Sequence, residues 1–160
     1  MRLSTLRTLL LTTAATTLSQ ARITGISAPA TLAPNETFTL TLISTSYIQS
    51  VADVAVAWGF DVAPGYPGIL GSFTDSAYLG PCLSNQAENI SISATVPAGL
   101  STEFYRGKDL LLNAGVYSLY GASGEPVTSG FNVTVRIANE TSCEDAASSQ
   151  RAWVQNSECV

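Results

Sequence analysis

The apolar run Val51–Phe60 limits the fold of this chain more than any other stretch. Side chains of two sizes alternate along it, and a period of two is typical of a β-strand. The residues expected on its larger apolar face are Ala52, Val54, Val56, Trp58 and Phe60. Because the other face is also nearly apolar, we expect this strand in the middle of a β-sandwich, not at its rim.

Other short stretches also have the composition of strands and are separated by Pro, Gly and Asn turns. They are Arg22–Ser27, Thr37–Ser44, Glu88–Val96, Val116–Tyr120 within Leu110–Ala122, and Phe131–Ile137. Helical periodicity is almost absent. The sequence therefore predicts an all-β fold, and we favour an immunoglobulin-like β-sandwich over a barrel, without the Cys–Trp–Cys pattern of antibody domains.

The first 21 residues have the three regions of a secretory signal peptide. Arg2 and Arg7 supply the positive charge, and the apolar run Thr8–Leu18 is too short to span a bilayer. The small residues at both ends of Ser19–Ala21 then predict cleavage after Ala21. We expect three segments: a signal peptide at 1–21, a β-sandwich domain at 22–138 and a tail at 139–160.

The mature chain is expected to be acidic and extracellular. Removing Arg2 and Arg7 from seven basic residues leaves five against twelve acidic ones, a formal charge of −7. An acidic chain without a basic cluster argues against nucleic acid and anionic membrane as partners. No later stretch is long enough to cross a membrane, so we expect no membrane anchor. We also expect a monomer.

Three cysteines follow the signal peptide: Cys82, Cys143 and Cys159. Secretion favours a disulfide, and an odd count leaves one thiol over. We prefer the pair Cys143–Cys159, which would staple the tail and stabilise it by about 3 kcal/mol in the chain-entropy model. Pairing of Cys82 with Cys143 or with Cys159 remains open. A short helix over Ala146–Val154, capped by Ser142, is also expected in this tail.

Four Asn-x-Ser/Thr sequons are present, at Asn35, Asn89, Asn132 and Asn139. Such sequons accept N-linked glycans in secreted chains when they lie in solvent. The alternation just described places Asn89 and Asn132 on the outward faces of their strands. We therefore predict a glycoprotein with these four sites.

The chain contains no His, which removes Ser-His-Asp and Cys-His nucleophile activation and ordinary His-ligated metal sites. The cysteines have no CxxC spacing, so we expect no metal, no cofactor and no enzyme activity. A glycosidase needs only two carboxylates, and an unforeseen pair is kept as a minor alternative. Solvated surface positions are expected for Asp53, Asp61 and Asp75, and a core position for Trp58.

A set of short motifs in this order resembles the fungal necrosis-inducing secreted proteins, a family of effectors. The motifs are Ala21–Ile26, Tyr47–Val51, Val54–Ala57, Tyr66-Pro67-Gly68, Tyr78–Pro81, Ser84-Asn85 and Ser118–Ser123. The likeness covers about Arg22 to Ile137, and Cys143–Val160 matches no family feature. It implies a secreted protein of a plant-associated fungus that suppresses pattern-triggered immunity by acting on receptor-associated kinases. Some members trigger host cell death, and action inside the host cell is left open.

A rigid sandwich that presents loops is a binding scaffold, which agrees with this resemblance. The long stretch Asp61–Ala77 is read as a surface loop or as a loop that hides a small hairpin. We expect partner contacts from Tyr66, Pro67 and Gly68 in this loop and from Tyr47 and Gln49 in the turn that precedes Val51. The alternative function is a carbohydrate- or cell-wall-binding module that stacks sugars on exposed aromatic rings.

Overall fold

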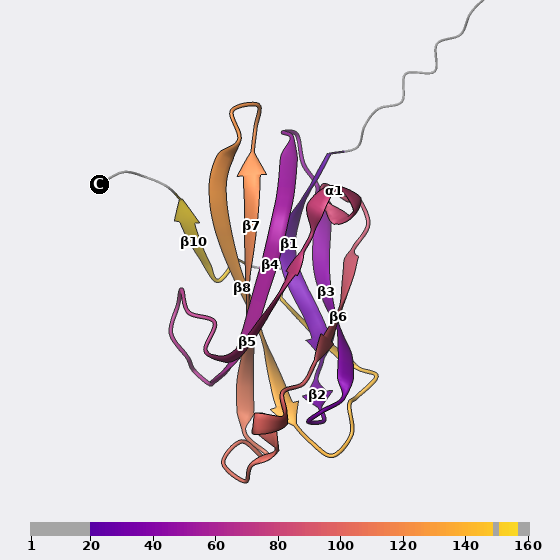
Figure 1. Ribbon diagram of the computed structural model, residues 1–160, viewed down its shortest axis with the longest axis vertical. Helices are drawn as coiled ribbons and strands as arrows, with labels where there is room; N and C mark the ends of the chain where they lie inside the picture. The colour runs from indigo at the N-terminus through magenta and orange to yellow at the C-terminus, as the bar shows by residue number, and fades with distance from the viewer. Residues whose placement is uncertain (1–19, 149–150, 157–160) are drawn as a thin grey trace, which may run out of the picture.

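The alternating stretches form two antiparallel β-sheets that pack face to face in the computed structural model (Figure 1). The structure describes residues 20–148 and 151–156. The four-stranded sheet has the order β6 (Ile90–Thr95), β3 (Thr37–Ser46), β1 (Ala21–Pro29) and β9 (Asp145–Ser148). The other sheet has the order β10 (Trp153–Asn156), β8 (Glu125–Ile137), β7 (Asp109–Tyr120), β4 (Val51–Val62) and β5 (Ser72–Tyr78).

Three shorter elements complete the described chain. Strand β2 (Thr31–Leu32) pairs in parallel with β8, so the chain changes sheets directly after β1. A single helical turn, α1 (Gly80–Leu83), follows β5, and a 3-10 turn, η1 (Ala98–Ser101), follows β6. The expected all-β fold is therefore confirmed, whereas the immunoglobulin-like connectivity stays a prediction.

The core lies between the sheets and is built from every second side chain. On β3 the buried residues are Phe38, Leu40 and Leu42, as the alternation predicts. Burial of side chains of this size contributes about 1.5–3 kcal/mol each relative to exposure. The same rule holds for β6, where Ile90, Ile92 and Ala94 are buried, and for the second half of β8, where Phe131, Val133, Val135 and Ile137 are buried.

Strand β4 departs from simple alternation. It lies between β5 and β7, as expected for a strand apolar on both faces, but its pairing with β7 shifts between Asp53 and Ala55. A bulge inserts one extra residue and reverses the phase of the side chains. Val56, Trp58 and Phe60 are therefore buried as predicted, whereas Ala52 is exposed and Asp53 is buried.

The long stretch after β4 is the hairpin that sequence analysis left open. Strand β5 pairs antiparallel with β4, so the connecting loop shortens to residues 63–71. The exposed pattern of β5 explains why it was not recognised: its residues are mostly polar or small, and it forms an edge.

The expected helix over Ala146–Val154 is wrong. Within the described part of this tail, Asp145–Ser148 is strand β9 on β1, and Trp153–Asn156 is strand β10 on β8. Ser148 and Ser149 have low helix propensity, and the free edges of both sheets offer backbone hydrogen-bond partners instead. The tail thus adds one strand to each sheet.

The chain joins the sheet before the predicted cleavage point. Ala21 is only 1% exposed, and its N–H donates to the side-chain oxygen of Asn85 at 2.7 Å. The carbonyl of Gln20 accepts a hydrogen bond from the N–H of Tyr47 at 2.8 Å. Residues 1–19 of the predicted signal peptide lie outside the described residues, and the boundary after Ala21 stays a prediction.

Trp153 holds β10 on the sheet by packing over two glycines of paired strands. Gly115 of β7 and Gly130 of β8 face each other across the ladder. A Cβ added at Gly130 would overlap the indole of Trp153, whereas one at Gly115 would lie 3.5 Å from it, an ordinary contact. Glycine inside a strand often marks such a close approach.

We therefore expect Gly130→Ala to displace Trp153 and destabilise the protein by about 1–3 kcal/mol, the usual cost of overpacking. The measurement is chemical denaturation together with tryptophan emission, because Trp58 stays buried and only Trp153 should shift to longer wavelength. Gly115→Ala is the matched control and should leave the emission unchanged. Equal stability and equal emission of the two variants would contradict the close packing of Trp153 on Gly130.

Candidate functional site

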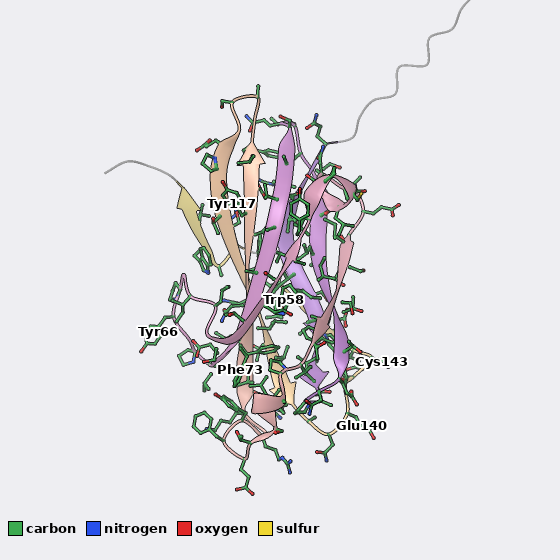
Figure 2. The ribbon with its side chains drawn as sticks, viewed as in Figure 1. Trp58, Tyr66, Phe73, Tyr117, Glu140 and Cys143 are labelled. Carbon is green, nitrogen blue, oxygen red and sulfur yellow. The ribbon has the colours of Figure 1, made fainter. Side chains whose placement is uncertain are left out.

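The structure separates the predicted contact residues into two surfaces. Tyr47 and Gln49 lie in the turn between β3 and β4, at the end of the sandwich that also carries α1 and the turn between β7 and β8 (Figure 1). Tyr66, Pro67 and Gly68 lie in the loop 63–71. Figure 2 shows Tyr66 well away from that end of the molecule, on the side of the larger sheet. The two sets therefore do not form one site.

The loop 63–71, here the Tyr66 loop, exposes its aromatic residue as expected. Tyr66 is 77% exposed. Gly65 and Gly68 adopt positive φ angles of 62° and 86°, which glycine accepts without strain. Tyr66 and Pro67 also line a small cavity of about 80 Å³ together with Asn132 and Trp153.

The turn between β3 and β4 borders a larger groove of about 190 Å³, here the arginine groove. Its side chains come from the two sheets, the turn and the tail. They are Arg22, Tyr47, Gln49, Tyr120, Glu125, Val127, Arg151 and Val154. Two predicted contact residues, Tyr47 and Gln49, therefore lie beside four polar side chains that sequence analysis did not single out.

Aromatic contacts fix one wall of the arginine groove. The guanidinium carbon of Arg22 lies 4.5 Å from the centre of the Tyr47 ring, a cation–π contact. The rings of Tyr47 and Tyr120 meet edge to face, with centres 6.0 Å apart. The hydroxyl of Tyr47 also lies 3.3 Å from the side-chain oxygen of Gln49 and donates to it. These contacts hold the guanidinium of Arg22 against the Tyr47 ring at the edge of the groove.

Both arginines of the groove lack a carboxylate partner among the described residues. The ion pair that the described residues do form joins Arg136 to Asp109 at 2.7 Å, on another part of the larger sheet. Glu125 lines the same groove but lies outside ion-pair distance of either guanidinium. Burial raises the pKa of Tyr120, and Arg151 offsets this in part by favouring the phenolate. The groove therefore holds two guanidinium groups outside ion pairs, beside two tyrosine rings and the carboxylate of Glu125.

A buried carboxylate supports this end of the sandwich. Asp53 is 3% exposed, so the expectation of a solvated acid is wrong for it. The bulge in β4 turns its side chain inward, where it accepts hydrogen bonds from the hydroxyl of Ser118 at 2.6 Å and the N–H of Asn85 at 3.2 Å. The Asp53 N–H donates to the hydroxyl of Ser84 at 2.8 Å. Asp53 therefore connects β4, β7 and the segment that follows α1, and Asn85 in that segment also accepts the N–H of Ala21, the last residue before the predicted cleavage point.

A third exposed feature is an aromatic cluster near η1 that sequence analysis missed. Phe73 of β5 contacts Tyr105 edge to face, and Tyr105 contacts Phe104 at an interplanar angle of 88°. Phe73 has a positive φ of 54°, which is uncommon for a bulky residue. The rings stand nearly perpendicular to their neighbours and so do not form the flat platform that stacks sugars. Trp58 is buried, as predicted.

The four sequons lie in different surroundings. Asn35, Asn89 and Asn139 are exposed, and the Asn89 side-chain oxygen accepts a hydrogen bond from the N–H of Ser44 at 3.0 Å. Asn132 is half-buried in the cavity beneath the Tyr66 loop. Glycosylation at these positions stays a prediction.

The preferred disulfide, Cys143–Cys159, cannot be placed because Cys159 lies outside the described residues. Cys82 and Cys143 are both exposed and unbonded to each other. They lie on different parts of the molecule, since Cys82 belongs to α1 and Cys143 lies toward the opposite end in Figure 2. A pairing through Cys159 stays a prediction for either thiol.

The described residues contain neither a metal-binding cluster nor a membrane-spanning helix. No group of three or more His, Cys, Asp or Glu side chains is placed to hold a metal ion. Within residues 20–148 and 151–156, no helix is long and apolar enough to cross a membrane.

Comparisons with known proteins agree on one family. The sequence model of the Nis1 family matches residues 19–136. The chain is 44% identical over 135 residues to necrosis-inducing secreted protein 1 of Colletotrichum higginsianum, covering 84% of this chain and 90% of that protein. It is 41% identical over 126 residues to the protein of the same name from Colletotrichum orbiculare, covering 78% of this chain and 75% of that protein.

Among solved structures, a superoxide reductase (neelaredoxin) from Ignicoccus hospitalis is similar at a TM-score of 0.37 and 11% identity. The similarity covers 74% of this chain and 83% of that one. A likeness this low carries no argument about fold or function.

The role of Asp53 can be tested by substitution. Asp53→Ala leaves the hydroxyl of Ser118 and the N–H of Asn85 without their acceptor, so we expect a loss of about 2–3 kcal/mol in the free energy of unfolding. Asp75→Ala is the control, because Asp75 is an exposed carboxylate of the neighbouring strand β5 and should change stability by less than about 0.5 kcal/mol. Urea denaturation of both variants measures the difference. Similar midpoints for the two variants would contradict a stabilising role of the Asp53 carboxylate.

The raised pKa of Tyr120 predicts a dependence of stability on alkaline pH. The folded protein keeps the Tyr120 proton to a higher pH than the unfolded chain does. This stabilisation is complete below the ordinary tyrosine pKa of about 10 and is lost as pH rises through the folded pKa. Absorbance titration at alkaline pH should show one late-ionising tyrosine that Tyr120→Phe removes. A late ionisation that persists in this variant would contradict the assignment.

Proposed function

The chain belongs to the Nis1 family of necrosis-inducing secreted proteins, and on that premise we propose that it is a non-enzymatic effector that binds receptor-associated kinases of plant immunity. The family match over residues 19–136 is the observation that carries this proposal. It covers strands β1 to β7 and all but the last residue of β8, and it leaves out β9, β10 and Arg151 of the arginine groove. The relatives are named as secreted proteins, which agrees with the signal peptide expected here.

The architecture supports a binding role. Two packed sheets give a rigid body whose turns hold side chains in fixed positions, and such surfaces recognise partners without large rearrangement. Ile48, at the tip of the turn between β3 and β4, is 95% exposed, and Tyr66 stands free on the Tyr66 loop. Tyrosine is among the most common anchors of protein interfaces, and an exposed aliphatic side chain such as Ile48 adds apolar contact area beside such anchors.

A carbohydrate-binding module is the second candidate. The exposed rings of Tyr66, Phe73 and Phe104 favour it, because sugars pack on aromatic faces. The nearly perpendicular arrangement around Tyr105 argues against a continuous platform. We therefore rank this candidate below kinase binding.

The test is a binding assay on the purified, glycosylated mature protein. One arm uses cytoplasmic kinase domains of plant immune receptors, and the other uses insoluble chitin, glucan and cellulose. We expect saturable binding to a kinase domain, absent after denaturation of the protein, and no retention on the polysaccharides. Retention on a polysaccharide without kinase binding would replace the effector proposal with the carbohydrate module.

Variants of exposed tyrosines locate the contact surface. We expect Tyr66→Ala or Tyr47→Ala to weaken kinase binding about tenfold or more, as for an interface anchor. Tyr117→Ala is the matched control, because Tyr117 is an exposed tyrosine of β7 outside both surfaces (Figure 2). Unchanged affinity in both test variants, with their stability intact, would exclude both surfaces as anchors.

A further inference from the structure

The arginine groove collects positive charge on a chain that is otherwise acidic. The described residues after the predicted signal peptide contain five basic side chains, and two of them, Arg22 and Arg151, line this one groove. Of the other three, Arg136 pairs with Asp109, the ammonium of Lys108 lies over the ring of Phe104, and Arg106, which has no ion pair among the described residues, lines a separate pocket that also contains Glu36. The unpaired positive charge of the groove is thus a local exception to the negative field of the whole protein.

The chemistry of the groove fits an oxyanion. A guanidinium presents several N–H donors in one plane and binds the oxygens of a phosphate in pairs. Arg22 is held by its contact with Tyr47, so less freedom is lost when it binds an anion. The phenol of Tyr120 and the amide nitrogen of Gln49 add O–H and N–H donors on the same wall.

We propose that the arginine groove binds a phosphorylated side chain of the protein partner, between the guanidinium groups of Arg22 and Arg151. This inference rests on the proposed function, because active protein kinases carry phosphorylated loops that are themselves recognised by arginines. The groove volume of about 190 Å³ accommodates a single side chain and not a folded element. The half-buried rings of Tyr47 and Tyr120 contact the apolar stem of that side chain.

The surroundings favour one phosphate on a protein over an extended polyanion. Glu125 also lines the groove and offsets part of the charge of the two arginines, so the remaining positive charge suits one phosphate better than several. The formal charge of −7 on the mature chain also opposes nucleic acid and anionic lipid surfaces, which need several basic contacts in a row. The exposed side chain of Ile48 in the adjoining turn offers an apolar contact to the partner residues beside the phosphate.

The direct test is isothermal titration of the full mature protein with synthetic peptides. Three peptides share one neutral Gly-Ser-Ala background and carry phosphotyrosine, phosphothreonine or glutamate at the same position. We expect at least one phosphopeptide to bind at least about tenfold more tightly than the glutamate peptide, with affinity falling as salt rises. Equal binding of all three peptides, or none, would overturn the proposal.

Charge-removing variants assign the binding to the groove. Arg22→Gln and Arg151→Gln should each weaken phosphopeptide binding about tenfold, and Arg22→Lys should fall between Arg22→Gln and the unaltered protein, because lysine keeps the charge but not the planar fork. Glu125→Gln should strengthen binding. Arg106→Gln removes the same charge elsewhere on the surface and should leave the affinity unchanged. An equal loss in Arg106→Gln would indicate a general charge effect and contradict the site.

A final comparison separates this inference from the proposed function. The kinase domain is used as purified and after phosphatase treatment. We expect dephosphorylation and the two glutamine variants of the groove arginines to weaken binding to the same extent, and not additively. If kinase binding persists but ignores phosphorylation, the groove proposal fails while the effector proposal stands. If phosphopeptides bind but no kinase does, the groove stands and the choice of partner fails.

Discussion

The packing of two sheets through alternate side chains is the constraint on which the rest of the structure depends. Each sheet buries one face, so every strand must keep its apolar side chains in phase with those of its neighbours. Phe131 of β8 and Leu40 of β3, both fully buried, meet this requirement from opposite sheets. The turns at the ends of the strands are then fixed by the register of the sheets, which is why the loops can carry recognition without their own internal core.

The bulge in β4 between Asp53 and Ala55 breaks this phase inside a central strand, and it has a structural use. It turns Asp53 inward, where its carboxylate gathers donors from β7 and from the segment after α1. Asn85, held in this way, accepts the N–H of Ala21 at the start of β1. One buried carboxylate therefore links β4, β7 and the segment after α1 at the end of the sandwich where the arginine groove opens.

The Tyr66 loop and the arginine groove differ in chemistry, so we expect them to contribute differently to binding. The Tyr66 loop presents an aromatic ring on glycine-containing turns, and the arginine groove presents unpaired cations beside half-buried phenols. Aromatic anchors contribute affinity through apolar burial, whereas charged groups contribute selectivity and faster association. A partner that meets both surfaces would have to extend along the larger sheet, since the two surfaces lie apart.

The sequence by itself determined the all-β class, the buried positions of β3, β6 and β8, and the family, because side-chain alternation and ordered motifs are local properties of the chain. It did not determine the burial of Asp53, because a bulge shifts the phase without a clear sign in the sequence. It also did not show that Arg22 and Arg151 lie in one groove with Tyr47 and Tyr120. These residues are far apart in the chain and meet only because strand order and sheet packing bring them together, and alternation carries no information about either.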